Sequence, residues 1–324
     1  MNQCYDLSLS NKVPMYLMNS KVVRIATRQS PLALWQANHV RELLLKQWPN
    51  LTIELLPMIT SGDRFLKDKL LSAGGKGLFV KELEEALLDK RADLAVHSTK
   101  DMPAILPEGL SLSAICKRHN PFDALISKEF TSLNNLPQNA VIGTSSLRRQ
   151  SQLLAYRPDL EIKTLRGNIN TRLGKLESGE YQAIILAAAG LERMELDHLI
   201  TELISDEIML PACGQGALCI ECRADDREIQ RLVNSLNDPL SALCVNTERR
   251  VNAQLGGNCQ VPLAIYCTAT KVNQLLLKAK ILSLDGSQII FDSQKGNWEE
   301  ADMIADKCTQ ALLNKGASNL LSAC

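Results

Sequence analysis

Arginines occur in three pairs, each at a place where a predicted strand gives way to a predicted helix. Guanidinium can pair with carboxylate through two parallel hydrogen bonds, which lysine cannot do. In open α/β sheets ligands bind beyond the carboxyl ends of the strands, and an anionic ligand would explain cations placed there against the helix dipole. A single arginine is commonly an ordinary surface residue, but three pairs indicate an anion site. The pairs are Arg24 and Arg28, Arg148 and Arg149, and Arg166 and Arg172.

One aspartate and one cysteine are further candidates for chemistry. Asp101 follows a predicted buried strand, and Pro103 disfavours helical geometry at the residue before it, so Asp101 is expected to project from a strand end into a cleft. A carboxylate there can act as acid, base or stabiliser of a cation; the alternative, a turn aspartate bonded to backbone, stays open. Cys259 lies in the loop 256–260, where a thiol is exposed enough to react.

The other cysteines point to core packing. The chain has 10 cysteines, but disulfide frameworks belong to shorter, cysteine-dense secreted chains. Cys219 and Cys222 form a C-x-x-C pair within a segment that alternates like a strand, and no second pair or histidine cluster completes a metal site. We therefore expect core filling and no metal. The histidines suggest no catalytic triad.

Composition limits the class of protein. The 324 residues suggest two or three domains. The 36 basic and 36 acidic residues give zero net charge, so no global field attracts nucleic acid or anionic membrane, and 4% aromatic residues argue against a base-stacking platform. Neither a signal peptide nor an apolar run of about 18 residues is present, and the cytoplasm is the expected compartment.

The elements expected to position these residues form three units. In each of the first two, strands alternate with helices, which indicates a mostly parallel sheet. Ser30 and Pro31 give an N-cap and first residue of one helix, and another helix is expected to begin at Ser145 or Ser146. From Asp238 a long helix, three strands and a last helix indicate a small α+β unit. The expected strands are 22–27, 51–59, 92–97, 124–126, 141–143, 160–165, 183–186, 261–269, 274–284 and 287–292; the expected helices are 31–48, 78–89, 169–177, 239–254 and 298–314.

Taken together, several motifs closely resemble those of the porphobilinogen deaminase (hydroxymethylbilane synthase) family from about residue 22 to the end. The motifs are Arg24-Ile25-Ala26-Thr27-Arg28, Gly74-Gly75-Lys76-Gly77-Leu78-Phe79, His97-Ser98-Thr99-Lys100-Asp101, Gly143-Thr144-Ser145-Ser146-Leu147-Arg148-Arg149-Gln150, Leu165-Arg166-Gly167-Asn168 and the Cys259 loop.

The resemblance implies an α/β fold of two domains similar to type II periplasmic binding proteins, followed by a smaller α+β domain. It places domain 1 at 21–116 and 217–235, domain 2 at 117–216 and domain 3, with the cofactor cysteine, at 236–324. Residues 1–20 have no counterpart in the family and are expected to be a disordered extension.

The resemblance also implies an activity. The family joins four porphobilinogen molecules head to tail into linear hydroxymethylbilane, with release of four ammonia molecules, in tetrapyrrole (haem) biosynthesis. A dipyrromethane cofactor attached to Cys259 through a thioether would prime the chain, and Asp101 would assist deamination and stabilise cationic pyrrole species. Porphobilinogen carries two carboxylates, which would explain the arginines without a net positive charge.

The remaining site residues are carried over from the family motifs. Cofactor contacts would come from Lys100, Asp101, Thr144, Ser146, Arg148, Arg149 and Arg166, and substrate contacts from Arg28, Ser30, Arg166, Arg172 and Arg193, with Lys76 and Phe79 in a mobile loop. Two departures are Asn258, which precedes the cysteine where the family has glycine, and Ser72, where relatives often have lysine. A monomer is expected, and handover of product to uroporphyrinogen-III synthase follows from pathway logic alone. Rival readings are a solute-binding protein with the same cleft and nucleic-acid binding through Arg148 and Arg149.

Overall fold

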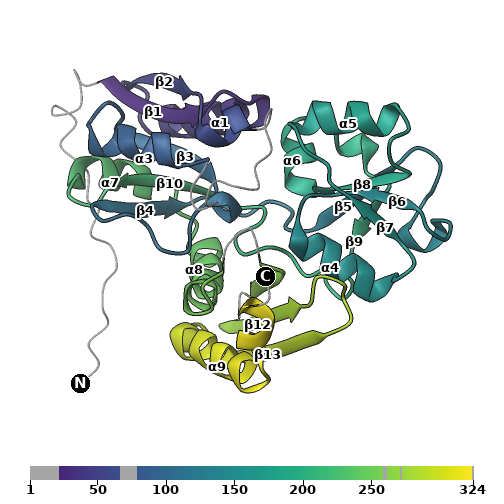
Figure 1. Ribbon diagram of the computed structural model, residues 1–324. Coiled ribbons are helices and arrows are strands. Elements are labelled where there is room, and N and C mark those ends of the chain that lie inside the picture. The colour runs from purple at the N-terminus through teal and green to yellow at the C-terminus, as the bar shows by residue number, and fades with distance from the viewer. Residues whose placement is uncertain (1–21, 66–78, 258–260, 271, 323–324) are drawn as a thin grey trace.

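The computed structural model describes residues 22–65, 79–257, 261–270 and 272–322. They form three units, each built on one sheet (Figure 1). The first two units lie side by side, and the third lies beneath them, with α8 next to the first unit. The expected fold class, two α/β domains and a smaller C-terminal α+β domain, is confirmed.

The first sheet has the strand order β2-β1-β3-β10-β4. β1 runs parallel to β2 and β3, whereas β10 runs antiparallel to β3 and β4. Because β10 belongs to chain that returns from the second unit, it enters the sheet without the helical crossover that a parallel neighbour would need. Its strands are β1 (Val22–Arg28), β2 (Thr52–Met58), β3 (Leu94–Ser98), β4 (Leu110–Ile115) and β10 (Leu218–Arg223).

The second sheet repeats this plan with the order β7-β6-β8-β5-β9. β6 is parallel to β7 and β8, and β5, the first strand after the chain leaves the first unit, is antiparallel to β8 and β9. The expectation of mostly parallel sheets is confirmed with one exception in each sheet: four strands run in the same direction, and β10 in the first sheet and β5 in the second run against them. Its strands are β5 (Asp123–Ser127), β6 (Val141–Gly143), β7 (Glu161–Lys163), β8 (Ala183–Ala187) and β9 (Glu202–Ile204).

Helices that begin next to the facing edges of these sheets have strong N-terminal signals. The Ser30 side chain accepts from Ala33 N at the start of α1 (Pro31–Gln47), and Ser146 accepts from Arg149 N at the start of α4 (Leu147–Tyr156). Asn168 caps α5 (Ile169–Glu177) in the same way. Such caps satisfy N–H groups that the helix leaves unpaired. The other helices of these units are α2 (Ser61–Phe65), α3 (Lys81–Leu88), α6 (Ala188–Arg193) and α7 (Arg227–Asn234).

The third unit is an antiparallel sheet, β11-β12-β13, packed against helices. Its apolar core joins inward residues of the sheet to α8 and α9. The last expected helix begins as a 3₁₀ turn at Trp298–Glu300 and becomes α-helical afterwards. The elements are α8 (Pro239–Gln254), β11 (Leu263–Thr270), β12 (Gln274–Leu282), β13 (Ile289–Asn297), α9 (Ala301–Asn314) and α10 (Ala317–Ser322).

The C-x-x-C pair fills the core, as expected. Cys219 and Cys222 on β10 are completely buried, and they join different apolar clusters on the two faces of the first sheet. Within the described ranges no group of three or more His, Cys, Asp or Glu side chains is arranged to hold a metal ion. None of the helices described is long and apolar enough to cross a membrane.

Candidate active site

A cleft of about 920 Å³ lies between the first and second units and is lined from both. From the first unit come the end of β1, the start of α1 and the turn after β3; from the second come the 166–172 turn and α6. Seven cationic side chains and two carboxylates line it, so the cleft carries the excess positive charge that the arginine pattern predicted. The cations are Arg28, Lys100, Arg149, Arg166, Arg172, Lys175 and Arg193, and the acids are Asp63 and Asp101.

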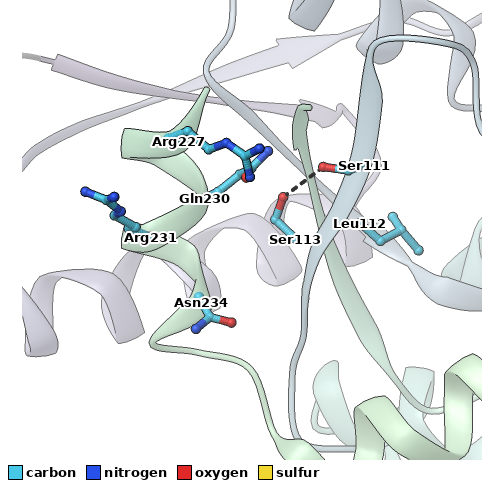
Figure 2. A pocket seen from close by; sticks show the side chains of 7 residues that line it. All are labelled: Ser111, Leu112, Ser113, Arg227, Gln230, Arg231 and Asn234. Atoms are coloured by element: carbon cyan, nitrogen blue, oxygen red, sulfur yellow. Dashed lines mark hydrogen bonds between the residues drawn. The ribbon is translucent and has the colours of Figure 1, made fainter. Parts of the chain in front are cut away.

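A second hollow, of about 570 Å³, lies between the edge strand β4 and α7 (Figure 2). Arg227 and Arg231 line it, but Arg231 points away from the strand and both side chains are exposed. None of the residues singled out in the sequence lines this hollow. The larger cleft is therefore the candidate active site.

Asp101 lies just beyond the carboxyl end of a strand, as expected. It ends a single 3₁₀ turn, Thr99–Asp101, directly after β3, and Met102 before the proline is extended, with φ −76° and ψ 140°. Asp101 is exposed and lines the cleft. Burial, and next the charge of Arg149, lower the pKa of neighbouring Lys100 to about 8, against the raising effect of Asp101. The one exposed carboxylate therefore stands within a field of cations.

Arg28 and Phe79 form one wall of the cleft. The Arg28 guanidinium lies 4.3 Å from the centre of the Phe79 ring, a cation–π contact, and also pairs with Asp63. Burial raises the pKa of Asp63, but hydrogen bonds from Arg28 and the Thr60 hydroxyl outweigh it and hold the pKa below its ordinary value. An anion that binds Arg28 must share it with Asp63. Lys76 and Ser72 lie outside the described residues.

Arg172 and Arg193 are deeply set cations on the opposite wall. Arg172 Nε donates to Gly167 O at 2.7 Å, and Arg193 Nη2 donates to Gly216 O at 2.7 Å. Burial lowers the pKa of each to about 10, and the buried Nε of Arg193 has no hydrogen-bond partner in the described part of the chain. Unpaired, desolvated cations are costly unless an anion binds. A ligand with several carboxylates, such as dipyrromethane or porphobilinogen, fits this lining.

Arg148 and Arg149 point to different places. Both side chains are buried, Arg148 at 5% exposed and Arg149 at 6%, but Arg149 lines the cleft, whereas Arg148 donates to Leu210 O at 2.8 Å and is absent from the lining. Both contact Asp123, which is completely buried at the start of β5. Arg148 is thus placed behind the cleft rather than in it.

The remaining expected polar contacts divide in the same way. Ser30 and Arg166 line the cleft. Thr144 and Ser146 do not; the Thr144 hydroxyl accepts from Ser146 N, and Ser146 caps α4. Arg24 is turned away and pairs with Asp93. Cys259 and Asn258 lie outside the described residues.

The pattern of the sequence missed several residues that shape the cleft. Asp63 and Asp123 both bind arginines there, and Gln36 Nε2 donates to the Oγ of Ser98, a lining residue, at 2.9 Å. The sequence holds one indication of the role of Asp123: it is a charged residue at the start of an apolar strand, where an unpaired carboxylate would be costly. It holds none for Asp63 and Gln36, because their partners are distant in the sequence.

Comparison with known proteins identifies the family of the chain. Residues 23–231 match the family "Porphobilinogen deaminase, dipyromethane cofactor binding domain", and residues 242–314 match "Porphobilinogen deaminase, C-terminal domain". The chain is 78% identical over 305 residues to the porphobilinogen deaminases of Legionella pneumophila strains Lens and Paris, covering 94% of this chain and 99% of each relative.

Among solved structures the chain is similar to the VFT2 domain of Bordetella pertussis BvgS (TM-score 0.43, 14% identity, 68% of this chain and 88% of that one). It is also similar to a putative methionine-binding lipoprotein of Bacillus subtilis (TM-score 0.43, 18% identity, 68% and 92%). These likenesses are distant and concern the fold alone. The two family matches and the identity to the Legionella proteins decide the matter: the chain belongs to the porphobilinogen deaminase family.

Proposed function

We propose that the cleft between the first two units is where the chain carries out the activity of its family. That activity is hydroxymethylbilane synthase (EC 2.5.1.61), the head-to-tail condensation of four porphobilinogen molecules with release of four ammonia molecules, primed by a dipyrromethane cofactor. The observation that supports this location is the set of seven cations around one exposed carboxylate, Asp101. The substrate carries two carboxylates and the cofactor more, and the reaction develops positive charge on a pyrrole.

The cleft arginines would hold acetate and propionate groups. Arg149 and Arg166 would contact the cofactor, with Lys100 beside them, and Arg28, Arg172 and Arg193 would contact the substrate. The fixed hydrogen bonds of Arg172 and Arg193 to backbone carbonyls orient their guanidinium groups in advance, so a carboxylate need not order them. Ser30 would add a hydrogen bond from the α1 end, although its hydroxyl already caps that helix.

Asp101 would be the catalytic residue. Its carboxylate would accept hydrogen bonds from pyrrole nitrogens and stabilise the positive charge that grows when the C–N bond of the aminomethyl group breaks, with the nitrogen leaving as ammonia and the methylene carbon staying on the pyrrole. The cations on the walls neutralise the carboxylates of the ligand and leave Asp101 as the anion that faces the reacting carbon. We expect Asp101→Asn to fold and load substrate but to lose nearly all turnover, as measured by porphobilinogen consumption.

Cys259 would carry the cofactor through a thioether. The cofactor, when bound, supplies a covalent primer that keeps the growing chain attached between additions. Intact mass tests the attachment: protein made in a host that supplies porphobilinogen should exceed its sequence mass by the dipyrromethane and should colour with Ehrlich's reagent. Cys259→Ser should abolish both signals, and Cys213→Ser, at a partly exposed cysteine, should retain them. Wild-type protein without either signal would contradict the proposed attachment.

Further expectations concern organisation. We propose the division into domain 1 (21–116 and 217–235), domain 2 (117–216) and domain 3 (236–324), which is supported by the strands that each sheet recruits. We also propose a monomer that acts in the cytoplasm without binding nucleic acid or membrane and that passes its product to uroporphyrinogen-III synthase. Sedimentation analysis of the purified chain tests the first of these, since a stable dimer would contradict it.

A further inference from the structure

Asp123 is a buried carboxylate that lies behind the cleft and contacts two arginines. Its Oδ1 accepts from Arg149 Nε at 2.9 Å and from Arg149 Nη2 at 2.7 Å, and Oδ2 lies 2.8 Å from Arg148 Nη1. The Gln215 amide also donates to Oδ1, at 3.1 Å. Asp123 itself is completely buried and does not line the cleft, so it cannot touch a ligand there.

Arg149 is held on two sides by these contacts. A guanidinium has five N–H donors. Asp123 takes Nε–H and one Nη2–H, and Ile185 O accepts one Nη1–H at 2.9 Å. One N–H on each terminal nitrogen is left, and because Arg149 lines the cleft these two donors are available to a ligand. Two parallel N–H groups match the two oxygens of a carboxylate.

Arg148 completes the arrangement from behind. It is buried, donates to Leu210 O and faces the second oxygen of Asp123. Burial would by itself raise the pKa of Asp123, but Arg148 and Arg149 together hold the pKa far below its ordinary value. Two cations thus share one anion, and the group keeps one net positive charge at the cleft wall.

We infer that Asp123 is a positioning residue, which fixes Arg149 so that two of its N–H groups face a carboxylate of the bound ligand, and that Arg148 acts by balancing Asp123 rather than by touching the ligand. This rests on the proposed location of the active site. Loss of Asp123 would free the Arg149 side chain to leave its orientation and would leave Arg148 without its counter-ion. The main consequence is weaker binding of carboxylates, not a slower bond-breaking step.

The chain offers a matched control. Asp93 is also buried between two arginines: its Oδ2 lies 3.1 Å from Arg24 Nε and its Oδ1 3.6 Å from Arg223 Nη2. Neither Asp93 nor its partners line the cleft. Asp93→Asn therefore removes the same charge from a similar setting and reports the purely structural cost.

The experiment compares Asp123→Asn, Arg149→Gln and the double variant with wild type, in full-length protein, by intact mass for cofactor loading and by initial rates of porphobilinogen consumption. Asp123→Asn keeps an acceptor oxygen and the side-chain shape, so it is the variant that should fold. We expect its KM to rise about tenfold or its cofactor loading to fall, with kcat changed less, and the double variant to match Arg149→Gln because Asp123 acts through Arg149. Asp93→Asn should leave KM and loading unchanged.

Two results would overturn the inference. Unchanged KM and loading in Asp123→Asn would show that Arg149 needs no anchor. A double variant much less active than Arg149→Gln, at equal folded fraction, would show that Asp123 acts by another route. If wild-type protein fails to consume porphobilinogen, the proposed function itself is at fault, so the two failures are distinguishable.

Discussion

Glu84 should make the stability of this protein fall as pH rises. It lies on α3, nearly buried, next to Glu221 and His97, and its Oε1 has no hydrogen-bond partner in the described ranges. His97 Nε2 and Glu221 Oε2 are 3.1 Å apart. Burial, followed by the negative charge of Glu221, raises the pKa of Glu84 from 4.5 to about 7, while His97 opposes the shift.

The sign follows from proton linkage. Because the folded pKa is raised, the folded state binds a proton at Glu84 that the unfolded state releases above 4.5. The stabilising effect of the neutral side chain is therefore complete below 4.5 and is lost as pH rises to about 7. A shift from 4.5 to about 7, at about 1.4 kcal/mol for each pKa unit, costs roughly 3 kcal/mol of unfolding free energy.

Glu84→Gln removes this titration and keeps the shape of the side chain. We expect the unfolding free energy of the variant, relative to wild type, to rise by about 2 kcal/mol between about pH 5 and about pH 8, measured by urea denaturation. Glu85→Gln is the matched control, since Glu85 is its exposed neighbour and pairs with Lys81. A difference between Glu84→Gln and wild type that stays constant with pH would refute the assignment of a buried, proton-binding Glu84.

Three further changes test the cleft and its supports. Arg172→Gln should raise KM for porphobilinogen about tenfold with little loss of stability, since it removes a cation that lines the cleft; an unchanged KM would contradict its carboxylate role. Gly216→Ala should lower Tm by several degrees, since φ is +88° and an added Cβ would lie 2.7 Å from His119 O; an unchanged Tm would contradict this steric argument. Glu248→Gln should cost roughly 3 kcal/mol in urea unfolding, because buried Glu248 accepts from Arg118; a loss below about 1 kcal/mol would contradict it.

Most of the secondary structure could be predicted from short-range sequence patterns. The caps at Ser30, Ser146 and Asn168 fix three helix starts beside the cleft, and each depends on residues within one turn. β11 and β12 were predicted nearly in full because alternation between buried and exposed residues is also a local pattern, whereas β13 was expected at 287–292 and extends to Asn297.

The pairing of some strands depends on segments that are far away in the sequence. β4 was not predicted as a strand, and its partner β10 follows it by more than a hundred residues, as the pairing of Leu112 with Glu221 shows. β9, also not predicted, is a three-residue edge strand that pairs with β5. In each sheet the antiparallel strand is the first one that follows a passage of the chain from one unit to the other: β5 in the second unit and β10 in the first. No short-range pattern reveals this direction.

The arginine pattern predicted a cleft but could not say which arginines face it. Arg24, Arg148 and Arg149 look alike in the sequence, yet Arg24 turns to Asp93, Arg148 turns to Asp123, and only Arg149 reaches the lining. What separates them is the position of a buried carboxylate. Each acid neutralises part of the charge of two arginines, and only at Asp123 does one of the pair also line the cleft. Two similar ion-pair groups thus have different consequences, because a carboxylate between two arginines anchors a ligand-binding cation only where the sheet edge opens onto the cleft.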